Sequence, residues 1–303
     1  MLIFDQMTKR VEDDLLTYRN SPNDYPFMAT VYTRYRLRDG TLMAASRKIE
    51  RTFRPFGEPG LIDGLVRVSE NEITPEDYVG SFGLLGFSNL AHRALVPTLP
   101  SALERNPEWG EFRHKFTQYH QEALKAVVRL PRADPIDWFL AHARTVALCV
   151  KFAGLFHEGD EHAILDAIQD LPAKGYAAQA SMVSLPTDRW RESLRDAARP
   201  SELIGFEICN LISSNIRGVE RWVDSGYGAL TANPKTYFVS SSTIEAIYWQ
   251  LADKIAAELI RRCEGCRRFF IARDKRQTYC PPFPGSTRSR CSSRLNTTNH
   301  RHR

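Results

Sequence analysis

The sequence predicts an α+β protein in which a mainly helical body with a small N-terminal β-hairpin or sheet is followed by a C-terminal four-cysteine module. Three observations support this fold class. Apolar residues recur at helical spacing along most of the chain, the clearest alternation at period two falls in residues 31–46, and four of the six cysteines lie in residues 261–303. We therefore expect a body over residues 1–260, with a candidate sub-boundary near residues 100–133, and a basic module over residues 261–303.

The composition is that of a soluble protein with a real core. The chain has 303 residues, 43% of them hydrophobic and 25% charged. Asp5 interrupts the N-terminus before the apolar region of a signal peptide can form. The best candidate for a membrane span, residues 139–156, contains His142, Arg144 and Lys151. We expect a cytoplasmic protein with reduced thiols and no membrane segment.

The first expected elements are a short helix and a basic hairpin. Apolar residues at helical spacing indicate a helix within residues 1–20. Residues 31–37 then alternate as a strand does, Asp39-Gly40 supplies a turn, and residues 41–46 form the return strand. The cations of this hairpin form either a solvated sheet face or a second nucleic-acid surface: Arg34, Arg36, Arg38, Arg47, Lys48, Arg51 and Arg54.

A loop, a strand and a capped helix are expected next. Glycine and proline recur over residues 55–64 and predict a loop, and residues 65–68 predict a short strand. Thr74 is a candidate helix N-cap, because a proline and two acids follow it at the positive end of the helix dipole. The glycine-containing stretch 80–86 lacks the lysine of a phosphate-binding loop.

The strongest helix signal of the body covers residues 136–156, which carry a continuous apolar stripe. His142 lies off that stripe, so we expect a surface or capped histidine rather than a ligand. The two histidines of residues 157–162 are five apart across a Gly-Asp break, which does not match the spacing of a metalloprotease helix. Asp160 is expected to cap a helix over residues 163–171 instead.

The last third of the body is expected to be helical with two short strands. Residues 172–187 form a linker or ordered loop, helices cover residues 188–198 and 201–216, and strands cover residues 227–231 and 237–240. The expected core positions of the second helix are Leu203, Phe206, Ile208, Leu211 and Ile212.

A final helix is expected to carry the C-terminal module as a rigid stem. Ser242 and Glu245 have the spacing of a capping box, and an apolar stripe follows them as far as Ile260. That helix would run almost directly into Cys263.

Four cysteines near the end of the chain have the spacing of a structural metal site. Cys263-x2-Cys266 places two thiolates on one tight turn, thirteen residues separate that pair from Cys280, and ten more precede Cys291. Four thiolates suit one tetrahedral Zn²⁺, which replaces the core that so short a segment cannot build. A redox pair would need a strand before it and an amphipathic helix after it, whereas we expect a helix before the knuckle, and Arg267-Arg268-Phe269-Phe270 follows it. Structural disulfides would need an oxidising compartment.

The fourth ligand has more than one candidate. Cys291 completes a four-cysteine set, but His300 or His302 of the C-terminal tail could take its place. The remaining cysteines, Cys149 and Cys209, lie in apolar helices, where we expect small buried hydrophobic residues.

The charge of the chain is concentrated in the same module. Residues 261–303 contain twelve Lys or Arg and two acids, a net charge of +10 against +5 for the whole chain. Eleven of the twelve are arginine, which suits bidentate contacts with phosphate and guanine. A solvated basic tail is the alternative. The candidate nucleic-acid contacts are Arg267, Arg268, Arg273, Lys275, Arg276, Arg288, Arg290, Arg294, Arg301 and Arg303.

The order of these motifs resembles the CGNR-type zinc finger. The resemblance rests on Cys-x-x-Cys, Phe269-Phe270, a basic stretch, Tyr279-Cys280, Cys291-Ser292-Ser293-Arg294 and a basic end. That finger typically closes bacterial proteins with an N-terminal ABATE domain, described as stress-induced transcription regulators. The resemblance implies zinc ligation by the four cysteines and a pair of phenylalanines packed beneath the knuckle. Ser-Ser replaces the family's Gly-Asn, the gap before Cys291 is longer than usual, and the match covers about forty residues well.

The leading functional hypothesis is a zinc-dependent DNA-binding protein that regulates transcription, with the body as a sensory or dimerising domain. We expect one structural Zn²⁺, DNA as the partner, and a homodimer, an effector or a protein partner as further candidates. The alternatives are a protein-interaction module with a purely structural zinc tail and an unrecognised enzyme such as a nuclease. No nucleophile elbow, Walker A loop, Rossmann fingerprint or paired-acid motif is found, so the sequence predicts no enzyme.

Overall fold

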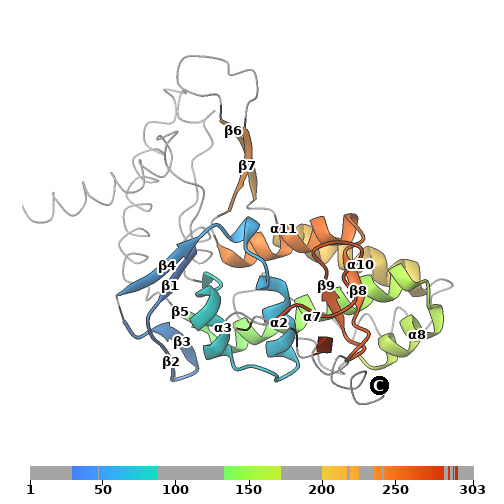
Figure 1. Ribbon diagram of the computed structural model, residues 1–303, viewed down its shortest axis with the longest axis horizontal. Helices are drawn as coiled ribbons and strands as arrows, with labels where there is room; N and C mark the ends of the chain where they lie inside the picture. The colour runs from blue at the N-terminus through green and yellow to red at the C-terminus, as the bar shows by residue number, and fades with distance from the viewer. Residues whose placement is uncertain are drawn as a thin grey trace, which may run out of the picture.

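The computed structural model describes residues 29–46, 48–87, 133–171, 200–216, 219–224, 235–240, 242–282, 286, 289 and 291–292. About half of this part of the chain is helical, and small antiparallel sheets lie at its N-terminal end (Figure 1). The expected helices within residues 1–20 and 188–198, the linker over 172–187 and the strand over 227–231 lie outside the described residues.

The predicted N-terminal hairpin is present, but its first strand is divided in two. Strand β1 (Ala29–Tyr32) pairs with β4 (Ile49–Phe53), whereas β2 (Tyr35–Arg38) pairs with β3 (Thr41–Ala44). Strand β5 (Ala133–Pro135) adds to the free edge of β3. Asp39 and Gly40 have φ values of 49° and 71°, as a two-residue hairpin turn with left-handed central residues requires.

The expectation of a strand over residues 65–68 is wrong, because these residues lie inside helix α2 (Leu61–Ser69). A short 3₁₀ turn, η1 (Pro55–Gly57), precedes it, so the expected loop over 55–64 is also partly helical. The apolar residues of this segment, with β-branched Val66 and Val68 among them, favour a strand locally. The buried residues of α2 lie at helical spacing, however, and tertiary packing overrides the local preference: Leu61, Ile62, Leu65, Val66 and Val68.

The helix start at Thr74 is confirmed in helix α3 (Pro75–Phe82). The Thr74 hydroxyl accepts a hydrogen bond from the Asp77 amide at 3.1 Å, and the Asp77 carboxylate accepts one from the Thr74 amide at 3.0 Å. These two bonds form a capping box, which satisfies amides that the first turn leaves without helical partners.

The glycine-containing loop after α3 wraps a buried carboxylate of the body. The amides of Leu85, Gly86 and Phe87 donate to the two carboxylate oxygens of Asp134 at 2.6, 3.2 and 2.9 Å. Burial raises the pKa of Asp134 to about 6, although the three amide donors act to lower it. This stretch therefore has a structural role, which is to hold the entry to the central helix against α3.

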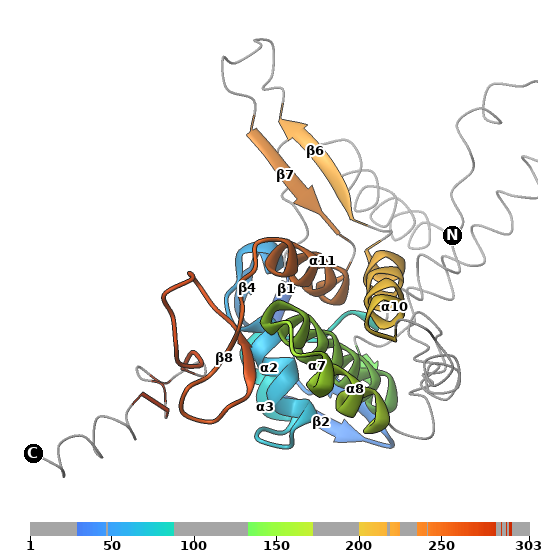
Figure 2. The ribbon, with the colours of Figure 1, turned by 90° about the vertical axis from the view of Figure 1, so that its right-hand side faces the viewer.

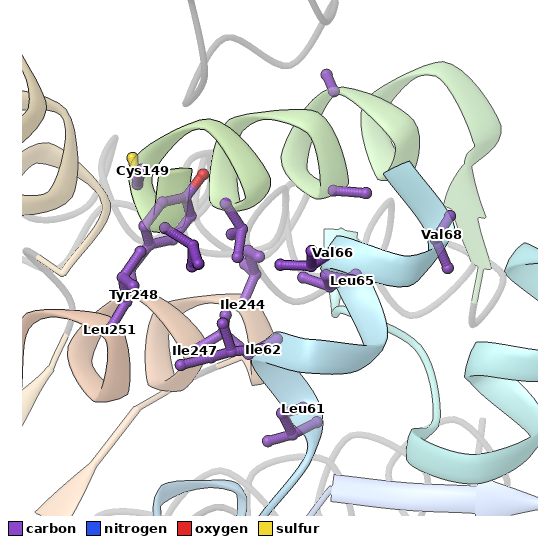
Figure 3. Packing of buried hydrophobic residues seen from close by; sticks show 14 of the residues in the cluster. Leu61, Ile62, Leu65, Val66, Val68, Cys149, Ile244, Ile247, Tyr248 and Leu251 are labelled. Carbon is purple, nitrogen blue, oxygen red and sulfur yellow. The ribbon is translucent and has the colours of Figure 1, made fainter. Parts of the chain in front are cut away.

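The core is built around helix α7 (Ile136–Glu158), with α2 packed along one side and α11 (Thr243–Ala256) along another (Figure 3). In Figure 3 the side chains of Leu65 and Ile247 point from α2 and α11 into the space between the three helices. Among the described residues, α7 is the one helix long and apolar enough to cross a membrane, but 67% of its apolar window is buried inside the protein.

The expectation that His142 is a surface or capped residue is wrong. The side chain is fully buried, and its Nδ1 lies 3.1 Å from the hydroxyl of Tyr248 on α11. The ring of Trp138 contacts it edge-on at 4.4 Å between centroids. Burial lowers the pKa of His142 to about 3, so the imidazole is neutral and belongs to the α7–α11 interface.

Helices α8 (Glu161–Gln169) and α10 (Pro200–Asn215) pack near the C-terminal end of α7. Asp160 caps α8, since its carboxylate accepts from the Ala163 amide at 3.0 Å, as expected. Two residues of α10 depart from expectation: Phe206 is 62% exposed rather than part of the core, and Cys209 is exposed whereas Cys149 is buried as expected.

A two-stranded ribbon, β6 (Glu220–Asp224) and β7 (Lys235–Val239), extends away from the helices (Figure 2). Strand β7 overlaps the strand expected over residues 237–240. At its base, the ring of Phe238 packs against Trp249 of α11 with centroids 4.2 Å apart.

The expected helical stem is shorter than predicted. Ser242 caps α11 as expected, but the helix ends at Ala256 rather than Ile260. Glu258 then takes a left-handed conformation, with φ of 57°, and the chain enters strand β8 (Ile260–Arg262). Strand β8 pairs with β9 (Phe269–Ile271), and this hairpin, not a helix, connects the body to the cysteines.

Candidate metal centre

The four C-terminal cysteines converge on one point. The Sγ atoms of Cys263, Cys266, Cys280 and Cys291 all lie within 4.8 Å of one another, and those of Cys280 and Cys291 are 3.5 Å apart. A tetrahedral ion with metal–sulfur bonds of about 2.3 Å requires sulfurs roughly 3.8 Å apart. All four are free thiols, so the cluster could hold one metal ion.

The first two ligands lie on the turn of the β8–β9 hairpin. The Cys263 amide donates to the Arg268 carbonyl at 2.8 Å, and the Arg267 amide donates to the Cys263 carbonyl at 2.8 Å. Arg267 takes a left-handed conformation with φ of 63°. These bonds close the turn and direct both sulfurs to the same side.

The third and fourth ligands come from the loop that follows β9. The Cys280 amide donates to the Cys263 sulfur at 3.4 Å, which ties the loop to the knuckle. Ser289 lies 3.8 Å from the Cys280 sulfur through its hydroxyl, which accepts a hydrogen bond from the Cys291 amide at 3.2 Å. Cys291 therefore joins the cluster, whereas the alternative ligands His300 and His302 lie outside the described residues.

Gly265 allows the fourth cysteine to approach the knuckle. A Cβ atom at this position would lie 2.7 Å from the Cβ of Cys291, closer than side chains pack. A residue with no side chain is therefore required between Cys263 and Cys266, a constraint that spacing alone does not reveal.

Electrostatics in the cluster also favour a cation. Burial acts to raise the pKa of Cys263, but hydrogen bonds from backbone amides, that of Cys280 first, lower it to about 7. Burial and the neighbouring sulfurs raise the pKa of Cys291, and burial raises that of Cys280. Four thiolates this close repel one another, so a positive ion among them is what would allow all four to ionise.

The two phenylalanines after the knuckle face opposite sides of strand β9. Phe270 is 2% exposed and packs with the cysteines, Ala272 and Tyr279. Phe269 and Ile271 pack against the main core of the body. The expectation that both phenylalanines lie beneath the knuckle is therefore half right, because side chains alternate along a strand.

The β8–β9 hairpin packs against α7 at a position where the helix has a glycine. Gly154 lies against the ring of Phe269, and a Cβ atom at this position would come within 2.2 Å of it. The guanidinium of Arg262 stacks over that ring, 4.5 Å from its centroid, and pairs with Glu158 of α7 at 2.5 Å. Figures 1 and 2 show β8 alongside α7.

Polar contacts with α2 complete the docking. The Ile271 amide donates to the carboxylate of Asp63 at 3.1 Å, and burial raises the pKa of that carboxyl to about 6. Arg67 donates to the Pro281 carbonyl at 2.8 Å. Arg268 pairs with both Glu70 and Glu72, so residues about 200 positions apart in the chain hold the module on the body.

The cations predicted to contact nucleic acid have different surroundings. Arg268 is paired as described, and Lys275 lies 2.9 Å from Glu258. Arg267, Arg273 and Arg276 are exposed to solvent. The remaining candidates lie outside the described residues: Arg288, Arg290, Arg294, Arg301 and Arg303.

A shallow hollow of about 440 Å³ lies beside the exposed cations. It is lined by Arg273, Asp274, Arg276, Gln277, Pro281 and Pro282. Gln277 fixes this loop, because its carbonyl accepts from the Arg273 amide at 2.8 Å and its amide group donates to the Tyr279 carbonyl at 2.9 Å.

Comparison with known proteins identifies no relative of this chain: no family model, no curated protein and no solved structure matches it. The interpretation of the site therefore depends on its own geometry and sequence.

Proposed function

We propose that the four cysteines hold one structural zinc ion and that the basic module fixed by this ion binds DNA, in a protein that regulates transcription. The observation that carries the proposal is the convergence of the four sulfurs within 4.8 Å, from residues spread over the last part of the chain. The body would then serve as a sensory or dimerising domain.

Zinc is proposed because of the donor set and its closure. Four sulfur donors suit zinc or an iron centre, whereas calcium and magnesium prefer oxygen. Four protein ligands leave no open position for a substrate, as in structural zinc sites. Among the described residues of the module, the other core members are few, namely Phe270 and Ala272 with Tyr279 beside them, so the ion would supply much of the module's stability.

DNA is proposed because of charge. Residues 261–303 carry a net charge of +10, which falls to about +8 with four thiolates and Zn²⁺. Most of these cations are arginines, which bind phosphate through two parallel hydrogen bonds. The resemblance of residues 263–294 to the CGNR-type zinc finger points the same way.

The test measures metal content and DNA binding on the same full-length protein. We expect one zinc per chain, and binding to random-sequence duplex DNA that weakens with salt at a log–log slope of about −5, if roughly six cations meet phosphates. A protein purified with iron or without metal contradicts the zinc assignment. A slope near zero contradicts DNA binding. Removing residues 261–303 is a poor test, because Phe269 and Ile271 belong to the main core.

A further inference from the structure

Two pairs of neighbouring cations in the module have opposite surroundings. Arg268 has 29% of its side chain exposed and pairs with Glu70 and Glu72, whereas Arg267 beside it is exposed. In the second pair, Lys275 lies 2.9 Å from Glu258 of the body with 62% of its side chain exposed, and the side chain of Arg276 is 94% exposed.

The paired cations hold the module in place. Arg268 follows Cys266 by two residues, and its guanidinium pairs with Glu70 and Glu72, which lie just after α2. One guanidinium thus joins the segment that carries the first two cysteines to the end of α2. Lys275 connects the loop after β9 to Glu258, which follows α11. A partner that bound Arg268 or Lys275 would have to displace the carboxylates of the body that pair with them.

The exposed cations meet less of this competition from the described residues. Among the described residues, no carboxylate lies within ion-pair distance of Arg267 or Arg273. Asp274 lies 3.8 Å from the Nε of Arg276, which is beyond hydrogen-bond distance, whereas Lys275 donates a hydrogen bond to Glu258 at 2.9 Å. Arg273 and Arg276 share the hollow beside the cluster, and Gln277 holds the loop that presents them.

We propose that Arg267, Arg273 and Arg276 form the face that contacts the phosphodiester backbone of DNA, and that Arg268 and Lys275 instead fix this face on the body. The inference rests on the proposed DNA binding and divides the module's described cations into those that meet phosphate and those that do not. Contacts with phosphate position a protein on the duplex without reading sequence. The body would therefore be held in a fixed orientation relative to the DNA.

The experiment compares neighbouring residues by the salt dependence of binding. The probe is random-sequence duplex DNA, and the protein is the full-length, zinc-loaded chain. Arg267→Gly removes a charge at a left-handed position that glycine occupies without strain. Arg276→Ala removes a cation whose side chain is 94% exposed. Each should make the slope about 0.9 less negative, and the double variant about 2 less negative.

Lys275→Ala is the matched control, because it removes the same charge one residue away and should leave the slope unchanged. Equal zinc content and circular dichroism establish that each variant is folded, and Arg273→Ala replaces any variant that is not. A slope reduced by Lys275→Ala but unaffected by Arg267→Gly and Arg276→Ala overturns the division. Salt-independent binding by the wild type overturns the proposed function instead, so the two failures are distinguishable.

Discussion

Phe269 and Phe270 are adjacent in the chain, yet they belong to two different hydrophobic cores. Phe269 packs against Gly154 in the main core of the body, and Phe270 packs with the four cysteines. Strand β9 therefore lies between the core of the body and the candidate metal centre. Because side chains of this strand pack in both cores, disorder in one core should destabilise the other.

Cys263→Ser is expected to destabilise the whole protein and not only its C-terminal module. Removal of one of four ligands weakens metal binding, the cysteine cluster loses its packing around Phe270, and β9 loosens on the body. Thermal unfolding of the zinc-loaded protein should shift to lower temperature, as it should after chelation of the wild type. Cys209→Ser changes an exposed cysteine outside the cluster and should leave both zinc content and unfolding unchanged. An unaltered body transition in Cys263→Ser would show that the two cores are independent.

Gly265→Ala is expected to lower the affinity for the metal. The added methyl group would lie 2.7 Å from the Cβ of Cys291, so the fourth ligand must move, at a cost of about 1–3 kcal/mol. Competition with a chromophoric zinc chelator measures the change. Gly57→Ala meets nothing within 4 Å and serves as the control. Full affinity in Gly265→Ala would mean that Cys291 does not bind the metal as the structure indicates.

Gly154→Ala is expected to loosen the hairpin from α7. Its methyl group would overlap the ring of Phe269, and overpacking of this kind costs about 1–3 kcal/mol, more than the gain from helix propensity. Gly80→Ala is a matched control, since it also lies in a helix but meets nothing within 4 Å, so it should be neutral or stabilising. Chemical denaturation of both variants measures the difference. Equal stability of the two would argue against close contact between α7 and β9.

Asp63 is expected to make the docking dependent on pH. Its folded pKa of about 6 lies above the ordinary value of 3.8, so the folded state binds the proton more tightly than the unfolded state does. Its contribution to stability is therefore present below pH 4 and is lost as the pH rises through 6. The facing charges are Arg67 and Arg268, which act to lower the pKa but do not offset burial.

The substitution Asp63→Asn removes this titration while keeping an oxygen that accepts the Ile271 amide. Relative to wild type, the unfolding free energy of the variant should rise by about 2 kcal/mol between pH 4 and pH 7. Denaturation curves of both proteins across that range measure the difference. A constant difference between them would show that Asp63 ionises normally.

The features that the sequence predicted correctly are local in the chain. The Asp39-Gly40 turn, the Thr74 N-cap and the Asp160 cap each depend on residues within a few positions of one another. The convergence of the four cysteines also followed from their spacing. Zinc, DNA and the CGNR resemblance remain predictions.

The features that the sequence did not predict depend on packing between distant segments. Residues 65–68 have the local preference of a strand but are helical because their apolar side chains meet α7. Nothing in the chain's periodicity connects Arg268 with Glu70, or Arg262 with Glu158. His142 was misplaced for the same reason, since its partner Tyr248 lies 106 residues away. The charge composition gives the number of cations in the module but not which of them form ion pairs with the body.

The three amide hydrogen bonds to Asp134 bring distant parts of the chain together. Phe87 is bound to Asp134 at 2.9 Å, so the polypeptide leaves this part of the body and re-enters it at almost the same point. Since the entropy of closing a loop grows only slowly with its length, this contact between residues 47 positions apart costs little more than a shorter closure would.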